Sequence, residues 1–138
     1  MLLDGDKIAT LAAVFLRQLL SQVPAGMISP PLRIGVVQTA YANGASTDYI
    51  SKTLGLETAC TATGVKHLHH VAKEFDVGIY FESNGHGTVL FHPKLVQRLS
   101  ALDDQVGYCC KTPRVCMCVC MYAVSYTHLR AHETTIEI

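Results

Sequence analysis

The apolar run Val77 to Phe81 is the feature that most restricts the fold of this chain. It is apolar enough to form a buried strand, and a polar loop at residues 82–87 follows it directly. We therefore expect a strand that presents this loop at its carboxyl end. Ligands of open α/β sheets bind at that edge.

Other segments complete an alternating pattern. Residues 33–39 and 56–61 predict two further strands, and residues 88–91 predict a short strand that returns antiparallel. Helices are expected at residues 46–54, 67–75 and from Pro93 onward, with Ser46 as a helix cap and Gly55 as a helix end. Strands that alternate with helices imply an α/β fold with a small, mostly parallel sheet, flanking helices and right-handed crossovers.

The residues before the first strand predict one helix and a linker. Asp4 or Asp6 can cap the helix, because a carboxylate accepts hydrogen bonds from the free amides of a first turn. A glycine and three prolines between residues 24 and 31 end it, so residues 1–32 are assigned to the end of a preceding domain. The apolar residues at helical spacing, expected on the buried face, are Ile8, Leu11, Ala12, Phe15, Leu19 and Leu20.

The polar loop after residue 81 has the chemistry of a sugar site. Glu82 offers two acceptor oxygens, and Asn84 offers both a donor and an acceptor. Gly85 and Gly87 let the backbone bend closely around a small ligand. Paired donors and acceptors with little apolar lining suit a sugar better than an apolar ligand.

Two motifs carry a family resemblance. The stretches T-G-V-K-H-L-H-H (63–70) and F-E-S-N-G-H-G-T (81–88) resemble the third domain of the phosphoacetylglucosamine mutases, a family of α-D-phosphohexomutases. The stretches D-G-D-K-I-A-T-L and V-V-Q-T-A-Y-A-N-G resemble the same family. The resemblance implies that residues 33–105 form its third α/β/α domain. It also places the loop that reads the sugar hydroxyls on Glu82, Asn84, Gly85 and His86.

The resemblance further implies an isomerase that interconverts N-acetylglucosamine 6-phosphate and 1-phosphate for UDP-N-acetylglucosamine synthesis. In that family a phosphoserine exchanges phosphoryl groups with the sugar, and Mg²⁺ neutralises charge. The chain lacks a phosphoserine loop, a metal loop that ends in arginine and the phosphate clamp R-P-S-G-T. We therefore expect a fragment that is inactive alone, without a catalytic residue or a metal ligand. The alternatives are a stand-alone sugar-binding module and a non-catalytic truncation.

The start of the helix near residue 67 is expected to lie beside the sugar. Thr63, Gly64 and Lys66 are therefore included among the substrate-binding residues, because helix N-termini favour anionic groups. Lys66 could equally be a solvated surface lysine. The three histidines at 67, 69 and 70 lack the spacing that zinc sites on helices prefer.

Residues 106–138 differ from the rest of the chain. Alternating Val, Cys and Met between residues 115 and 121 is what a GT-rich nucleotide repeat encodes, and residues 124–134 resemble a translated sequencing adaptor. We interpret this segment as an unstructured tail that comes from read-through. The alternative is a cysteine-rich metal-binding tail, although the C-x-x-C pairs of structural zinc sites are missing.

The composition excludes several classes of partner. The net charge is zero and 16% of the residues are charged, so the chain has no basic footprint for nucleic acid. No apolar run reaches the roughly 18 residues of a membrane span, and no signal peptide precedes the first helix. We expect a cytoplasmic protein whose partner is an amino-sugar phosphate.

Overall fold

The computed structural model describes residues 3–21 and 28–106. The chain divides into two compact units, Met1–His92 and Pro93–Ile138. The first unit holds a sheet and its flanking helices. In the second unit the described residues form one helix, α4 (Pro93–Val106), which begins at the predicted proline. The predicted tail lies outside the described residues, apart from Val106.

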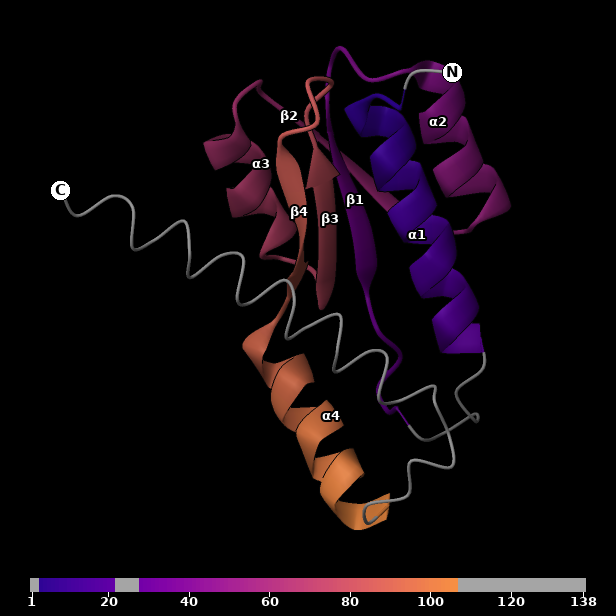
Figure 1. Cartoon of the computed structure of the whole chain (residues 1–138), viewed down its shortest axis with the longest axis vertical. Helices are drawn as coiled ribbons and strands as arrows, with labels where there is room; N and C mark the ends of the chain where they lie inside the picture. The colour runs from indigo at the N-terminus through magenta and orange to yellow at the C-terminus, as the bar shows by residue number, and fades with distance from the viewer. Residues whose placement is uncertain (1–2, 22–27, 107–138) are drawn as a thin grey trace, which may run out of the picture. The chain divides into compact units, whose positions relative to one another are not determined.

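A four-stranded sheet forms the centre of the first unit. Its strand order is β2-β1-β3-β4 (Figure 1). β1 runs parallel to β2 and to β3, whereas β4 pairs antiparallel with β3. The predicted α/β fold with a mostly parallel sheet is therefore confirmed. The strand bounds are Ile34–Thr39 for β1, Glu57–Thr61 for β2, Val77–Phe81 for β3 and Gly87–Phe91 for β4.

The central position of β1 explains its sequence. Both of its faces are covered, and residues 34–38 are all buried. A strand buried on both faces needs a continuous apolar run rather than an alternating one. The exception is Gln38, whose amide donates to Ser46 Oγ (3.2 Å) and accepts from Thr47 Oγ1 (2.8 Å). Its polar atoms are thus satisfied inside the fold.

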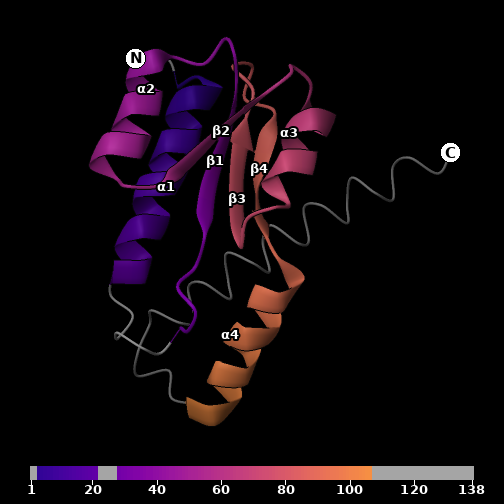
Figure 2. The same ribbon diagram turned by 180° about the vertical axis from the view of Figure 1, so that it is seen from behind.

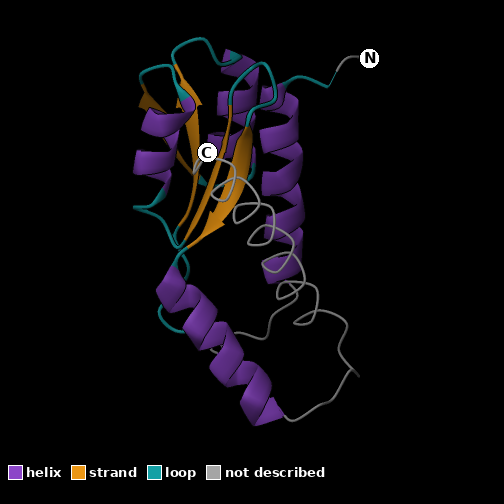
Figure 3. Ribbon diagram, turned by 60° about the vertical axis from the view of Figure 1, so that its left-hand side comes forward, coloured by secondary structure: helices purple, strands orange, loops and turns teal. Residues whose placement is uncertain are grey.

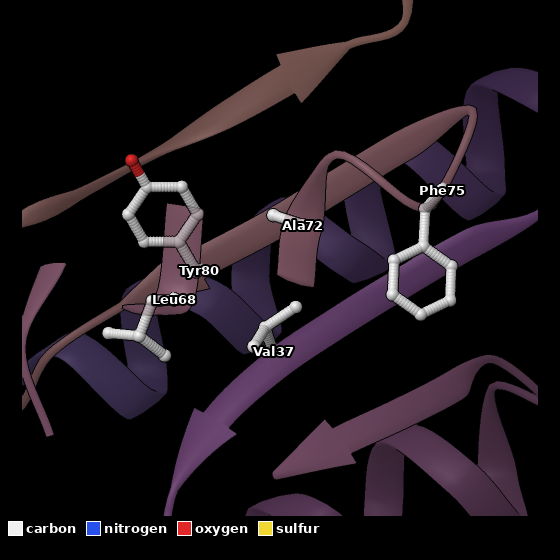
Figure 4. Close-up of a cluster of buried hydrophobic side chains, with 5 residues drawn as sticks. All are labelled: Val37, Leu68, Ala72, Phe75 and Tyr80. Atoms are coloured by element: carbon white, nitrogen blue, oxygen red, sulfur yellow. The ribbon is translucent and has the colours of Figure 1, made fainter. Parts of the chain in front are cut away.

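One helix, α3 (Val65–Ala72), covers one face of the sheet. Figure 4 shows that Leu68 and Ala72 of this helix lie over Val37 of β1 and Tyr80 of β3. Phe75, just after the helix, closes the cluster. The helix was predicted at residues 67–75. It begins two residues before that segment begins and ends three residues before that segment ends.

The helix α1 (Gly5–Ser21) packs on β3, on the face of the sheet opposite α3 (Figures 1 and 2). Figure 3 shows helices on both sides of the strands. The predicted buried face of α1 is wrong in part, because Leu11 and Phe15 are 57% and 37% exposed. Gly5, Ala9 and Ala13 are buried instead in the first half of the helix, where their small size lets the helix approach the sheet closely. The buried residues of α1 are Gly5, Ala9, Ala13, Leu16 and Leu19.

The helical segment between β1 and β2 begins at Gly44 rather than at the predicted residue 46. α2 (Gly44–Asp48) continues into a single π-helical turn, η1 (Tyr49–Thr53). Asn43 caps α2, because its side chain accepts a hydrogen bond from the Ala45 N–H (2.9 Å). The predicted cap, Ser46, instead donates its hydroxyl to the Asn43 carbonyl oxygen (2.8 Å). Gly55 follows the last turn with φ of 64°, as expected of a residue that ends a helix.

Within the described residues, every helix is too short or too polar to span a bilayer.

Tyr80 links the sheet to α3 and allows a stability test. Its hydroxyl lies 3.0 Å from His69 Nδ1, and burial raises the pKa of the Tyr80 hydroxyl above its ordinary value. We expect Tyr80→Phe to lower the free energy of unfolding by about 1 kcal/mol at pH 7, the value of one buried hydrogen bond. A folded-state pKa above the unfolded value means that stability is lost as pH rises above about 10. The Phe variant should therefore lose less stability than the wild type in that range.

Urea denaturation at pH 7 and pH 11 measures both effects. The matched control is Tyr41→Phe, because Tyr41 is 80% exposed and should change neither value. Equal alkaline losses in the wild type and Tyr80→Phe would contradict a buried, neutral Tyr80.

Candidate functional site

Three loops meet at the carboxyl edge of the parallel strands. Thr39 of β1 pairs with Thr61 of β2, and Val37 of β1 pairs with Tyr80 of β3, so the three strands end at nearly the same level. The loops after β1, β2 and β3 therefore leave the sheet side by side. All seven residues predicted to bind substrate belong to the last two of these loops or to the first turn of α3.

The turn at residues 82–86 is closed by its own hydrogen bonds. The Glu82 N–H donates to the His86 carbonyl oxygen (2.7 Å), and the Gly85 N–H donates to the Glu82 carbonyl oxygen (2.8 Å). Asn84 Oδ1 accepts from the His86 N–H (2.9 Å). The turn thus holds its shape without a ligand. Asn84 Oδ1 already accepts a hydrogen bond within the turn, so the Nδ2 group of Asn84 is available to donate to a ligand.

A single hydrogen bond joins the two predicted segments of the site. The Gly64 N–H donates to Glu82 Oε1 at 3.0 Å, although the two residues lie 18 positions apart. Gly64 has φ of 122°, a conformation that residues with a side chain rarely adopt. The glycine therefore allows the chain to turn its N–H toward Glu82 just before α3 begins. The second oxygen of Glu82 can still accept hydrogen bonds.

The other predicted residues of the second loop are exposed. Thr63 and Lys66 both face solvent, and Lys66 lies in the first turn of α3. Among the described residues, no hydrogen bond joins either of them to the turn at residues 82–86. The structure thus brings Gly64 to the turn, and the role of Lys66 toward a ligand stays a prediction.

The stretch Asp4 to Asp6 was predicted to cap α1, and Asp4 does so. Asp4 Oδ1 accepts from the Lys7 N–H (2.9 Å), and Oδ2 binds Lys7 Nζ (2.8 Å). Hydrogen bonding to Lys7 holds the pKa of Asp4 below its ordinary value. Asp6 has a different contact, since its Oδ2 accepts from the Asn43 N–H (3.0 Å).

The described residues do not fit a magnesium site. They contain no group of three or more His, Cys, Asp or Glu side chains placed to hold a metal ion. The two carboxylates of the Asp4 to Asp6 stretch face Lys7 and Asn43. No step that involves a metal ion is therefore assigned to them.

Sequence reasoning missed three residues that position the site. Gly5 lies against the Glu82 turn, Gln38 holds the start of α2, and Asn43 caps that helix. Only Gln38 gives a signal in the sequence, because a polar residue at the end of a buried apolar run needs a partner. The contact of Gly5 depends on tertiary packing and has no local signature.

An ion pair lies at the opposite edge of the sheet, where β1 and β2 begin. Arg33 Nε and Nη2 donate to the two carboxylate oxygens of Glu57 at 3.0 and 2.7 Å. Hydrogen bonding to Arg33 lowers the pKa of Glu57. The charges at this edge therefore satisfy each other, whereas Glu82 at the carboxyl edge keeps one oxygen for a ligand.

Comparison with known proteins agrees with this geometry. The sequence pattern described as phosphoacetylglucosamine mutase AMG1, domain III, matches residues 4–124. The chain belongs to the phosphoacetylglucosamine mutase family. The match to the family extends past residue 105, so the predicted start of a foreign tail at residue 106 stays a prediction.

This chain is closely similar in sequence and structure to individual members of the phosphoacetylglucosamine mutase family. The Candida albicans phosphoacetylglucosamine mutase is 58% identical over 98 residues, which cover 71% of this chain and 18% of that protein. A crystal structure of an N-acetylglucosamine-phosphate mutase in its substrate complex matches with a TM-score of 0.68 and 56% identity, over 71% of this chain and 18% of the other. The Aspergillus fumigatus mutase in complex with GlcNAc-6P and magnesium matches with a TM-score of 0.68 and 55% identity, over 75% and 19%. The chain spans about a fifth of the length of the curated relatives it matches.

The Gly64 to Glu82 hydrogen bond predicts the effect of Gly64→Ala. The added methyl group forces a strained backbone at φ of 122°, which costs about 1–3 kcal/mol. Relief of that strain should rotate the N–H away from Glu82. We expect the Glu82 amide resonance to move in ¹H–¹⁵N spectra and the melting temperature to fall.

Gly55→Ala is the matched control. Gly55 also has positive φ, but it precedes β2 at the opposite edge of the sheet. It should lower the melting temperature while the Glu82 and Gly85 amides keep their wild-type positions. The same shift of the Glu82 amide in both variants would argue against a specific contact with Gly64.

Proposed function

We propose that this chain is the sugar-reading part of a phosphoacetylglucosamine mutase, an isomerase that interconverts N-acetylglucosamine 6-phosphate and N-acetylglucosamine 1-phosphate. The observation that carries the proposal is the Glu82 carboxylate, held at the carboxyl edge of the sheet by the Gly64 N–H. Because the chain belongs to the phosphoacetylglucosamine mutase family, we infer that the ligand of this carboxylate is an amino-sugar phosphate.

The turn supplies the chemistry that sugar hydroxyls need. Glu82 Oε2 accepts a hydrogen bond from a hydroxyl while Oε1 stays with Gly64. The Nδ2 group of Asn84 donates to a hydroxyl oxygen, and its Oδ1 remains bonded to the His86 N–H. A donor and an acceptor on the same turn can bind the hydroxyls of a sugar in either of the two orientations that a phosphoryl exchange at O1 and O6 requires.

His86 and Lys66 have supporting roles in this proposal. His86 is exposed at the end of the turn and contacts oxygen atoms near the sugar. Lys66, exposed in the first turn of α3, attracts the phosphate. Positioning and electrostatic stabilisation dominate phosphoryl transfer, so a domain that only orients the sugar contributes directly to the rate.

We assign the phosphoryl-carrying serine and the Mg²⁺ site to other parts of the longer protein. The Aspergillus fumigatus relative was crystallised with GlcNAc-6P and magnesium, which supports a metal-dependent reaction for the family. When it is bound, the metal ion neutralises phosphate charge. We further propose a cytoplasmic reaction in UDP-N-acetylglucosamine synthesis, with an amino-sugar phosphate rather than nucleic acid or membrane as the partner.

Substitution of Glu82 tests the proposal. Residues 3–106 can replace the corresponding segment of the Candida albicans relative, which gives a complete mutase that carries this turn. We expect Glu82→Ala to lower kcat/KM by about tenfold to a hundredfold, since a hydrogen bond to a charged group contributes ~1.5–3 kcal/mol. Lys66→Ala should have a smaller effect, because the helix amides partly replace its charge.

Two further variants separate binding from folding. Glu82→Gln keeps an acceptor for the Gly64 N–H, so it should retain the melting temperature and still lower kcat/KM about tenfold. Glu57→Ala, which removes the carboxylate at the opposite edge, should leave kcat/KM within about twofold, because Glu57 pairs with Arg33 far from the Glu82 turn. Near-normal kcat/KM in folded Glu82→Ala would make Glu82 a structural turn residue.

The chain alone should show no turnover. Its proposed share of the reaction is sugar binding, and the phosphoryl-carrying serine is assigned above to another part of the longer protein. A coupled assay for the 1-phosphate, run with a protein purified from a mutase-deficient host, measures this. Sustained conversion of the 6-phosphate by the 138-residue chain would refute the division of roles.

A further inference from the structure

The first turn of α1 lies directly against the sugar-reading turn. The Gly5 N–H donates to the Ser83 carbonyl oxygen at 3.2 Å. A Cβ atom at Gly5 would overlap the Glu82 carbonyl oxygen and lie 2.6 Å from the Glu82 carbonyl carbon. These neighbours are backbone atoms, which cannot swing aside as a flexible side chain does. Only glycine fits at this position without displacing the turn.

The next residue of α1 reaches a second loop of the same edge. Asp6 Oδ2 accepts a hydrogen bond from the Asn43 N–H (3.0 Å), in the loop that follows β1. Asn43 in turn caps α2 through the Ala45 N–H. Adjacent residues of α1 thus contact the loop after β3 and the loop after β1.

Glu82 is held from two directions as a result. Gly64, just before α3, binds the Glu82 side chain, and Gly5 of α1 packs on the Glu82 backbone. These helices cover opposite faces of the sheet (Figures 1 and 2). A small displacement of either contact would move the carboxylate relative to a bound sugar.

We propose that Gly5 and Asp6 are positioning residues for sugar binding, with Gly5 fixing the Glu82 turn and Asp6 fixing the start of α1 against the loop after β1. This rests on the proposed function of the Glu82 turn. Helix capping explains Asp4, which binds Lys7, whereas the contacts of Gly5 and Asp6 reach the loops after β3 and β1. A site held to within about 0.5 Å depends on such supporting contacts.

The test uses ¹H–¹⁵N spectra of the whole 138-residue chain, titrated with N-acetylglucosamine 6-phosphate. In the wild type the amides of Gly64, Gly85 and His86 should shift saturably. Gly5→Ala should move the Ser83 to His86 amides before any ligand is added and weaken the apparent Kd about tenfold. A merely structural role would lower the melting temperature but leave the Kd of the folded chain unchanged.

Gly44→Ala is the matched control for Gly5→Ala. Both glycines are the first residue of a helix, but within the described residues a Cβ at Gly44 would meet no atom within 4 Å outside its own helix and its chain neighbours. We expect this control to keep the wild-type Kd. If Gly5→Ala also keeps the wild-type turn amides and Kd, the positioning role is overturned.

Asp6→Ala covers the case in which Gly5→Ala does not fold. It removes only the acceptor of the Asn43 N–H and should weaken the Kd by about two- to fivefold, with Asp4→Ala as the control for lost helix stability. An unchanged Kd in folded Asp6→Ala would contradict the proposal. If the wild type binds no sugar phosphate, the proposed function fails for this chain. The positioning role is then decided by whether Gly5→Ala, and not Gly44→Ala, moves the turn amides.

Discussion

The hydrogen bond from the Gly64 N–H to Glu82 Oε1 is the interaction on which the candidate site depends. It joins the loop after β2 to the loop after β3, two strands that do not pair with each other because β1 lies between them. The bond can form only because β2 and β3 both run parallel to β1 and end at the same edge. Sheet topology therefore brings the two segments together, and the positive φ of Gly64 directs the N–H at its acceptor.

A carboxylate suits this position because it has two oxygens. One oxygen of Glu82 fixes the side chain to the scaffold, and the other can accept from a ligand. A hydroxyl or an amide at residue 82 would have to accept both hydrogen bonds at a single, uncharged oxygen. Asn84 shows the same division, since its Oδ1 closes the turn and its Nδ2 remains available. Both side chains are thus oriented before a ligand arrives, which reduces the entropy lost on binding.

The sequence predicts the sheet and the turn well because both depend on local patterns. Branched apolar runs mark the strands, and glycine-rich polar residues after Phe81 mark the turn. The predicted buried face of α1 was wrong in part, because helical periodicity counts apolar residues without regard to size. Ala9 and Ala13 are buried because the helix lies close to β3, while Leu11 is left exposed. The contacts of Gly64 and Gly5 with Glu82 join distant segments, so no window of the sequence could reveal them.

The packing of α1 bears on how the domain is delimited. The boundary that the sequence predicts at residue 32 stays a prediction, and the compact unit Met1–His92 includes α1 together with the sheet. A module cut at residue 32 would lose the Gly5 contact with Ser83 and the Asp6 contact with Asn43. It would also expose the apolar side chains of β3 that α1 covers. The helix that precedes the linker is therefore part of what holds the Glu82 turn in place, and a stand-alone module would have to keep it.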